Sequence, residues 1–74
     1  MTKSEQKHTD WFKRQRMLWI DEMLCVYGFI NREHLCKKFG ISTPQASIDL
    51  KWFMRENSEW VSYNQSTKRY EAAK

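Results

Sequence analysis

Apolar side chains recur every three to four residues along much of this chain, which is the spacing of helices that bury one side. Over residues 10–27 a stripe with this spacing is formed by Met17, Ile20, Leu24 and Tyr27. Asp10 suits the N-cap of this first helix, because its carboxylate can accept a backbone N–H that has no partner within the helix. Gly28 follows the last apolar position, so we expect the helix to end there.

Two further helices are predicted at residues 32–39 and 43–56. The first has Asn31 as its N-cap, and Leu35 and Phe39 on its buried side. The buried side of the second consists of Ala46, Leu50, Phe53 and Met54. Three helices therefore precede residue 57.

The link between these two helices has the sequence of a helix-turn-helix. Gly40 suits the left-handed position that ends a helix, where a side chain would be strained. Ser42 or Thr43 can cap the next helix, and Pro44 fits its first turn because the N–H that proline lacks would have no partner there. Ser42 and Gln45 also have the spacing of a capping box.

After Asn57 the helical spacing gives way to alternation, which predicts a β-hairpin over residues 60–72 with a turn at residues 64–67. We call this hairpin the wing. The polar residues 1–9 are expected to form a flexible leader. The predicted fold is therefore mainly α with a small β-hairpin, a winged helix-turn-helix over residues 10–74. In that arrangement the third helix enters the major groove of DNA and the wing touches the backbone.

The net charge of +4 is concentrated at the two ends of the chain. Residues 1–16 hold five basic and two acidic side chains, residues 61–74 hold three and one, and residues 17–60 hold five and six. Positive charge beside a candidate recognition helix favours double-stranded DNA as the partner. With no signal peptide and no apolar run that could cross a bilayer, we expect a cytoplasmic protein without a membrane partner, in which Cys25 and Cys36 are reduced core thiols.

The third helix supplies the candidate DNA-reading residues. Thr43, Gln45 and Ser47 are predicted to contact base edges, although Gln45 can equally be used to cap the helix. Phosphate contacts are predicted for Arg14, Arg16, Ser42, Lys51, Arg55, Lys68 and Arg69. Because Lys68 and Arg69 are adjacent in a strand, only one of them should face DNA fully. Asp49 would repel phosphates, so we interpret it as structural, paired with a nearby basic residue or backbone N–H.

Other kinds of site are not supported by the sequence. The histidines and cysteines lack the spacing of a zinc site, and no phosphate-binding loop or nucleophile with its partners is present, so we expect no metal, no cofactor and no enzymatic activity. A competing hypothesis is a protein-interaction module, in which Trp52, Trp60 and the aromatic side chains of the first helix form a docking surface.

Four stretches of this chain resemble a known family. They are Arg16-x-x-Trp19-Ile20-Asp21, Tyr27 to Arg32, Phe39 to Leu50, and Tyr63-x4-Lys68-Arg69-Tyr70. Across residues 14–72 the chain is similar to the N-terminal winged helix of bacterial WYL-domain transcriptional regulators, which are DeoR-like, and most of all to the regulators of phage-defence islands.

This resemblance implies sequence-specific binding of promoter DNA, usually by a homodimer on an inverted repeat and usually for repression. Members of the family continue into a WYL ligand-sensing domain and a dimerising segment, neither of which these 74 residues contain. We therefore expect either a small stand-alone DNA-binding protein of phage or mobile-element origin, or the N-terminal domain of a longer regulator. An antagonist that competes with a longer homologous regulator is a further hypothesis.

Overall fold

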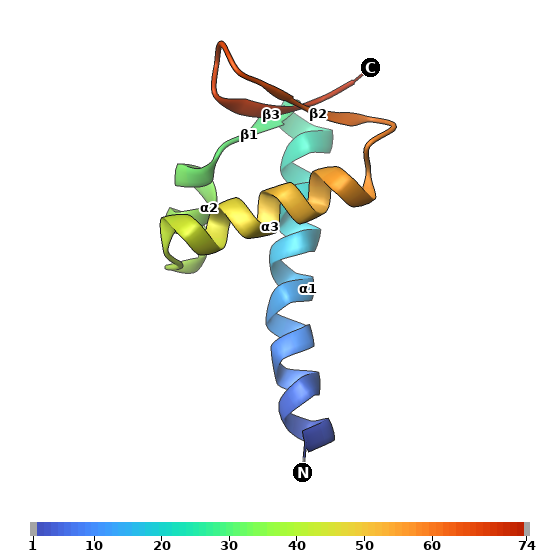
Figure 1. The fold of residues 1–74 in the computed structure, drawn as a ribbon, viewed down its shortest axis with the longest axis vertical. Coiled ribbons are helices and arrows are strands. Elements are labelled where there is room, and N and C mark those ends of the chain that lie inside the picture. The colour runs from blue at the N-terminus through green and yellow to red at the C-terminus, as the bar shows by residue number, and fades with distance from the viewer. Residues whose placement is uncertain (1, 74) are drawn as a thin grey trace.

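The computed structural model describes the backbone of residues 2–73 and the side chains of residues 11–73. Its elements, in chain order, are α1 (Thr2–Tyr27), β1 (Phe29–Ile30), α2 (Arg32–Phe39), α3 (Thr43–Glu56), β2 (Val61–Asn64) and β3 (Arg69–Ala72). Helix α1 runs along the long axis of the molecule, α3 crosses it, and the strands lie across one end (Figure 1). The three predicted helices and the hairpin are therefore confirmed.

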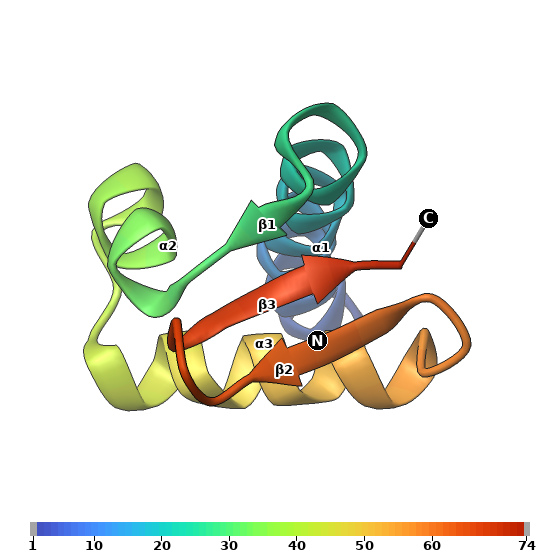
Figure 2. The ribbon, with the colours of Figure 1, turned by 90° about the horizontal axis from the view of Figure 1, so that it is seen from above.

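The wing is part of a three-stranded antiparallel sheet with the order β1-β3-β2 (Figure 2). Phe29 pairs with Glu71 and Ile30 with Tyr70, so β1 adds an edge to the hairpin. The sequence did not predict this strand, because two residues between a glycine and a helix cap are too few to show alternation. Through β1, the wing is fixed to the segment that links α1 to α2.

The core lies where the three helices meet the sheet. Its buried side chains are Ile20, Leu24, Ile30, Leu35, Ala46, Leu50, Phe53, Val61 and Tyr70. Two predictions for α1 are wrong. Tyr27 is 66% exposed although Leu24 in the same turn is buried, so the buried stripe ends one turn earlier than expected, and Cys25 is exposed on the outer side of the same helix.

The start of α1 also differs from the prediction. The helix begins at Thr2, so residues 2–9 are helical and Asp10 lies within the helix instead of capping it. These residues include no glycine or proline, and lysine, glutamate and glutamine propagate a helix readily. The flexibility expected of this segment stays a prediction.

The helix-turn-helix link has the predicted ends. Gly40 adopts the left-handed conformation with φ at 66°, and the Ser42 hydroxyl accepts the backbone N–H of Gln45 at 3.2 Å. The reciprocal capping box forms one helix earlier, where Asn31 Oδ1 accepts the N–H of His34 and His34 Nδ1 accepts the N–H of Asn31. The Gln45 amide does not return to Ser42, since it bonds to Asp49 instead.

Candidate nucleic-acid interface

One side of α3 faces away from the rest of the molecule. Pro44, Ile48, Lys51 and Arg55 are exposed and recur at helical spacing, opposite the buried Ala46, Leu50 and Phe53. Ile48 is 61% exposed, so its apolar side chain is accessible on this side of α3. We call these four positions the reading face of α3.

A groove lies beside the reading face, between α3 and the wing. Its lining residues are Arg32, Ser47, Lys51, Met54, Arg55, Ser58, Val61, Ser62, Tyr63, Gln65, Lys68 and Tyr70. Four of these side chains are basic and none is acidic. A concave surface lined by one sign of charge concentrates counter-charge, so the groove favours an anionic ligand.

Arg32 joins the groove from the first turn of α2. Its Nη1 donates a hydrogen bond to the Ser47 hydroxyl on α3 at 3.3 Å, and this contact holds the guanidinium at the edge of the groove. Tyr63 and Tyr70 lie on the wing side with ring centroids 4.8 Å apart. Burial and the neighbouring Tyr63 raise the pKa of Tyr70 above its ordinary value of 10.0, whereas Arg32 lowers it. The Tyr70 phenol therefore remains protonated at neutral pH.

The tip of the wing separates two basic neighbours. Asn64 closes the turn, because its side chain accepts the N–H groups of Ser66 and Thr67 and its carbonyl accepts the N–H of Lys68. Lys68, with φ at 60°, lines the groove. Arg69 lies on the other side of the sheet, with its guanidinium 4.0 Å from the Phe29 ring centre.

Arg16 and Gln45 both bind Asp49. Asp49 is 2% exposed, and its carboxylate accepts two hydrogen bonds from the Arg16 guanidinium and one from the Gln45 amide at 3.0 Å. The structural role predicted for Asp49 is thus confirmed, with Arg16 as its basic partner. The same pairing holds Arg16 between α1 and α3, away from the groove, because a guanidinium used by a buried carboxylate has little capacity left for phosphate.

The structure brings together some of the predicted contact residues. Ser47, Lys51, Arg55 and Lys68 line the groove. Ser42 and Thr43 are exposed at the start of α3, where the Ser42 hydroxyl caps the helix and Cys36 Sγ lies 4.0 Å from Thr43 Oγ1. The six predicted residues that do not line the groove are Arg14, Arg16, Ser42, Thr43, Gln45 and Arg69.

Three residues of this surface were not singled out in the sequence. For Ile48 the sequence held a signal, because an isoleucine lies there on the polar side of the predicted third helix. Arg32 and Tyr63 gave no such signal, because their positions depend on how α2 and the wing pack against α3.

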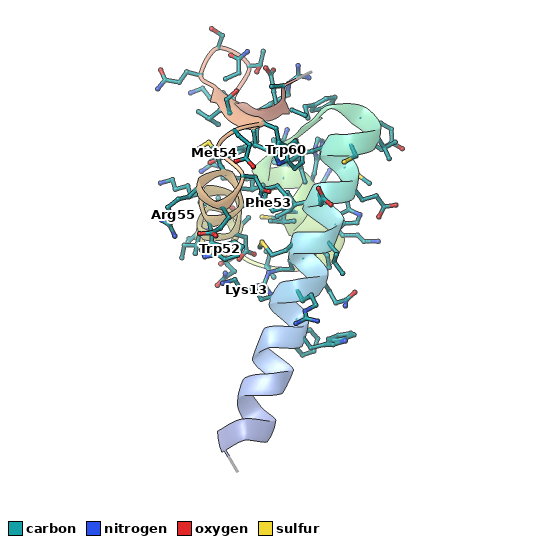
Figure 3. The ribbon with its side chains drawn as sticks, turned by 90° about the vertical axis from the view of Figure 1, so that its right-hand side faces the viewer. Lys13, Trp52, Phe53, Met54, Arg55 and Trp60 are labelled. Atoms are coloured by element: carbon teal, nitrogen blue, oxygen red, sulfur yellow. The ribbon has the colours of Figure 1, made fainter. Side chains whose placement is uncertain are left out.

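The two tryptophans of the competing hypothesis are used internally. The Lys13 ammonium lies 4.1 Å from the centre of the Trp52 ring, so α1 covers part of this side chain (Figure 3). Trp60 packs edge-on against Phe53 and donates its indole N–H to Asn57. Neither residue forms an open docking surface. The exposed aromatic pair of the described side chains is instead Trp11 and Phe12 on α1.

Within residues 2–73, no helix is long and apolar enough to cross a membrane. Among the side chains that can be placed, no three His, Cys, Asp or Glu residues gather as metal ligands would.

Three helices, a helix-turn-helix formed by α2 and α3, and a hairpin packed beside α3 define a winged helix-turn-helix domain. The sequence pattern of one family matches residues 13–74. The chain accordingly belongs to the family described as the BrxR transcriptional regulator winged helix-turn-helix domain.

Two curated relatives share this region. The chain is 38% identical over 64 residues to the DNA-binding transcriptional repressor CapW of Escherichia coli, and 36% identical over 62 residues to the repressor of the same name from Pseudomonas aeruginosa. These alignments cover 86% and 84% of the chain, but 21% of each relative. The chain thus spans about a fifth of the length of the curated relatives it matches.

Proposed function

We propose that this chain binds double-stranded DNA through α3 and the wing, and acts in the regulation of transcription as a repressor. The observation that carries the proposal is the convergence of Arg32, Lys51, Arg55 and Lys68 on a groove without a carboxylate, beside the reading face of α3. The names of the relatives, DNA-binding transcriptional repressors, support the same function.

The proposed interface divides into residues that bind phosphate and residues that read bases. Phosphates are neutralised by Arg32, Lys51, Arg55 and Lys68. This electrostatic attraction supplies most of the affinity of such modules. The exposed N-terminus of α3 adds a site for one phosphate near Ser42.

Base edges are read from the N-terminal half of α3, the part of a recognition helix that lies deepest in the major groove. Thr43 and Ser47 contribute hydroxyl groups that bond to either kind of base edge. Ile48 contributes an apolar surface that fits the C5-methyl group of thymine. Gln45 and Arg16 are left out of the interface because Asp49 binds them, Arg69 because its guanidinium lies over the Phe29 ring, and Arg14 because it belongs to α1 and not to α3 or the wing.

Selection of bound duplexes from a random-sequence library, at a fixed salt concentration, tests this function. We expect enrichment of a short motif that contains thymine. If two copies bind an inverted repeat, as the family resemblance implies, the motif will be palindromic with half-sites about one helical turn, ~34 Å, apart. Absence of enrichment together with absence of duplex binding would contradict the proposal.

A further inference from the structure

The outer side of α1 carries a stripe of exposed apolar residues among the described side chains. Trp11, Leu18 and Cys25 are seven residues apart, so they lie along one side of the helix, away from the buried Ile20 and Leu24. Trp11 and Leu18 are each 55% exposed. The three exposed side chains are aligned so that one straight helix can lie against all of them.

Polar residues border this stripe in a regular order. Arg14 and Asp21 are also seven residues apart and lie along one edge, whereas Gln15 and Glu22 lie along the other. The two ion pairs formed between described side chains, Arg16 with Asp49 and Arg69 with Glu71, involve none of these four residues. The charges of Arg14, Asp21 and Glu22 are therefore not neutralised by an ion pair among the described side chains, and the one printed contact of Asp21 is with Cys25 Sγ, 3.9 Å from its Oδ1.

We propose that a second copy of this chain pairs with α1 in antiparallel orientation, with Leu18 of both copies on the two-fold axis. In such a pair, residues on the same edge and at equal distances on either side of the axis meet, and every contact occurs twice. Arg14 then meets Asp21 of the second copy, Gln15 meets Glu22, and Trp11 packs on Cys25. The stripe is thus complementary to itself in apolar surface, charge and hydrogen bonding.

A parallel pair lacks this match. It brings Asp21 of one copy to the edge that holds Glu22 of the other, where like charges repel. It also brings Arg14 of one copy to the edge that holds Gln15 of the other, which offers no opposite charge. The charge pattern therefore selects the antiparallel orientation.

The pairing leaves both DNA-binding surfaces open. Helix α1 lies on the far side of α3 from Arg55 (Figure 3), so the reading faces of the two copies point away from each other. On the proposed function, such a pair joins two separate duplex segments, whereas an inverted repeat requires both reading faces on one side of a single duplex. The pairing surface is thus distinct from any contact between copies on one operator.

Sedimentation equilibrium of the 74-residue chain without DNA tests the pairing independently of the DNA-binding proposal. We expect a monomer–dimer equilibrium that Arg14→Glu or Asp21→Arg weakens roughly tenfold or more, because each change sets like charges against each other twice. Mixing the two variant chains should restore pairing as a heterodimer, since each altered residue then meets its opposite charge. The control Glu59→Arg changes an exposed charge elsewhere and should leave the equilibrium unchanged.

A disulfide probe tests the orientation. In a Cys25→Ser chain, Leu18→Cys should cross-link the two copies on oxidation, because the substituted positions meet on the axis. In the unaltered chain, the two Cys25 residues of an antiparallel pair lie about 21 Å apart along the helices and cannot bond. A Cys25 disulfide between copies, a chain that stays monomeric at every concentration, or a dimer insensitive to both charge variants would overturn the proposal. Thermal unfolding of each variant confirms that it is folded.

Discussion

At the residue scale, Asp49 has the largest predicted effect on stability. It is almost fully buried and binds both the Arg16 guanidinium, which is 16% exposed, and the Gln45 amide. Asp49→Ala should lower the free energy of unfolding by about 3–5 kcal/mol, because the arginine then stays buried without its counter-charge. Denaturant unfolding measures this loss.

The matched control replaces both partners. Arg16→Met with Asp49→Leu removes the two charges together and keeps apolar side chains of similar size between α1 and α3. Such replacements are often neutral or stabilising, so the double variant should be more stable than Asp49→Ala alone. A double variant that is no more stable would show that the pair is not the source of the effect.

Ile48 is the residue with the most specific predicted role in DNA reading. If its side chain packs on a thymine methyl group, replacing that thymine with uracil in the selected duplex removes about 0.8 kcal/mol, or roughly a fourfold loss of affinity. The Ile48→Ser variant should bind the two duplexes equally, because it has no methyl contact to lose. Paired titrations of both proteins with both duplexes provide the measurement. A wild-type chain indifferent to the methyl group at every thymine would exclude this role.

At the scale of elements, the ends of helices were the features most open to prediction. Gly40, Asn31 and Ser42 act on backbone groups within a few residues of themselves, so their roles can be read from local sequence. The start of α1 was missed because Asp10 is a good cap but the residues before it also favour a helix. A capping residue shows where a helix can begin, whereas the preceding sequence decides whether it does.

Lys68 combines a strained backbone with a role in the proposed interface. Its φ of 60° is a conformation that costs a non-glycine residue about 1–2 kcal/mol. Lys68→Gly should therefore raise the free energy of unfolding by about 1 kcal/mol and at the same time weaken duplex binding, because the wing loses its cation. Thermal unfolding and duplex titration of the same sample test both effects. Reduced stability, or unchanged affinity, would contradict the assignment of Lys68.

At the scale of the whole molecule, the contacts between elements were beyond sequence reasoning. Arg16 and Asp49 are 33 residues apart, and no local pattern identifies a guanidinium on α1 as the partner of that carboxylate. Arg32 likewise enters the groove because α2 packs against α3. The proposed interface thus leaves out four of the ten predicted DNA-contact residues even though the fold was predicted, since a fold follows from local patterns while a surface depends on the packing of distant segments.

Two sides of the molecule have different chemistry. The α3–wing side is concave and basic, whereas the outer side of α1 is apolar with alternating charges. Separation of this kind allows DNA binding and pairing between copies to be altered independently. Substitutions along α1 and substitutions in the groove should therefore have additive effects on the free energies of pairing and of DNA binding, as expected for residues with no shared partners.

The central claim is that cations of the α3–wing groove bind DNA phosphates, and the salt dependence of duplex affinity tests it most directly. These cations are Arg32, Lys51, Arg55 and Lys68. If all four contact phosphate, a plot of the logarithm of the binding constant against the logarithm of the salt concentration should have a slope of roughly −3.6. Lys51→Gln with Lys68→Gln should make this slope shallower by about 1.8. Lys37→Gln with Lys38→Gln, on the exposed last turn of α2 outside the groove, should leave it unchanged. A slope near zero, or equal effects of the two pairs, would contradict the account.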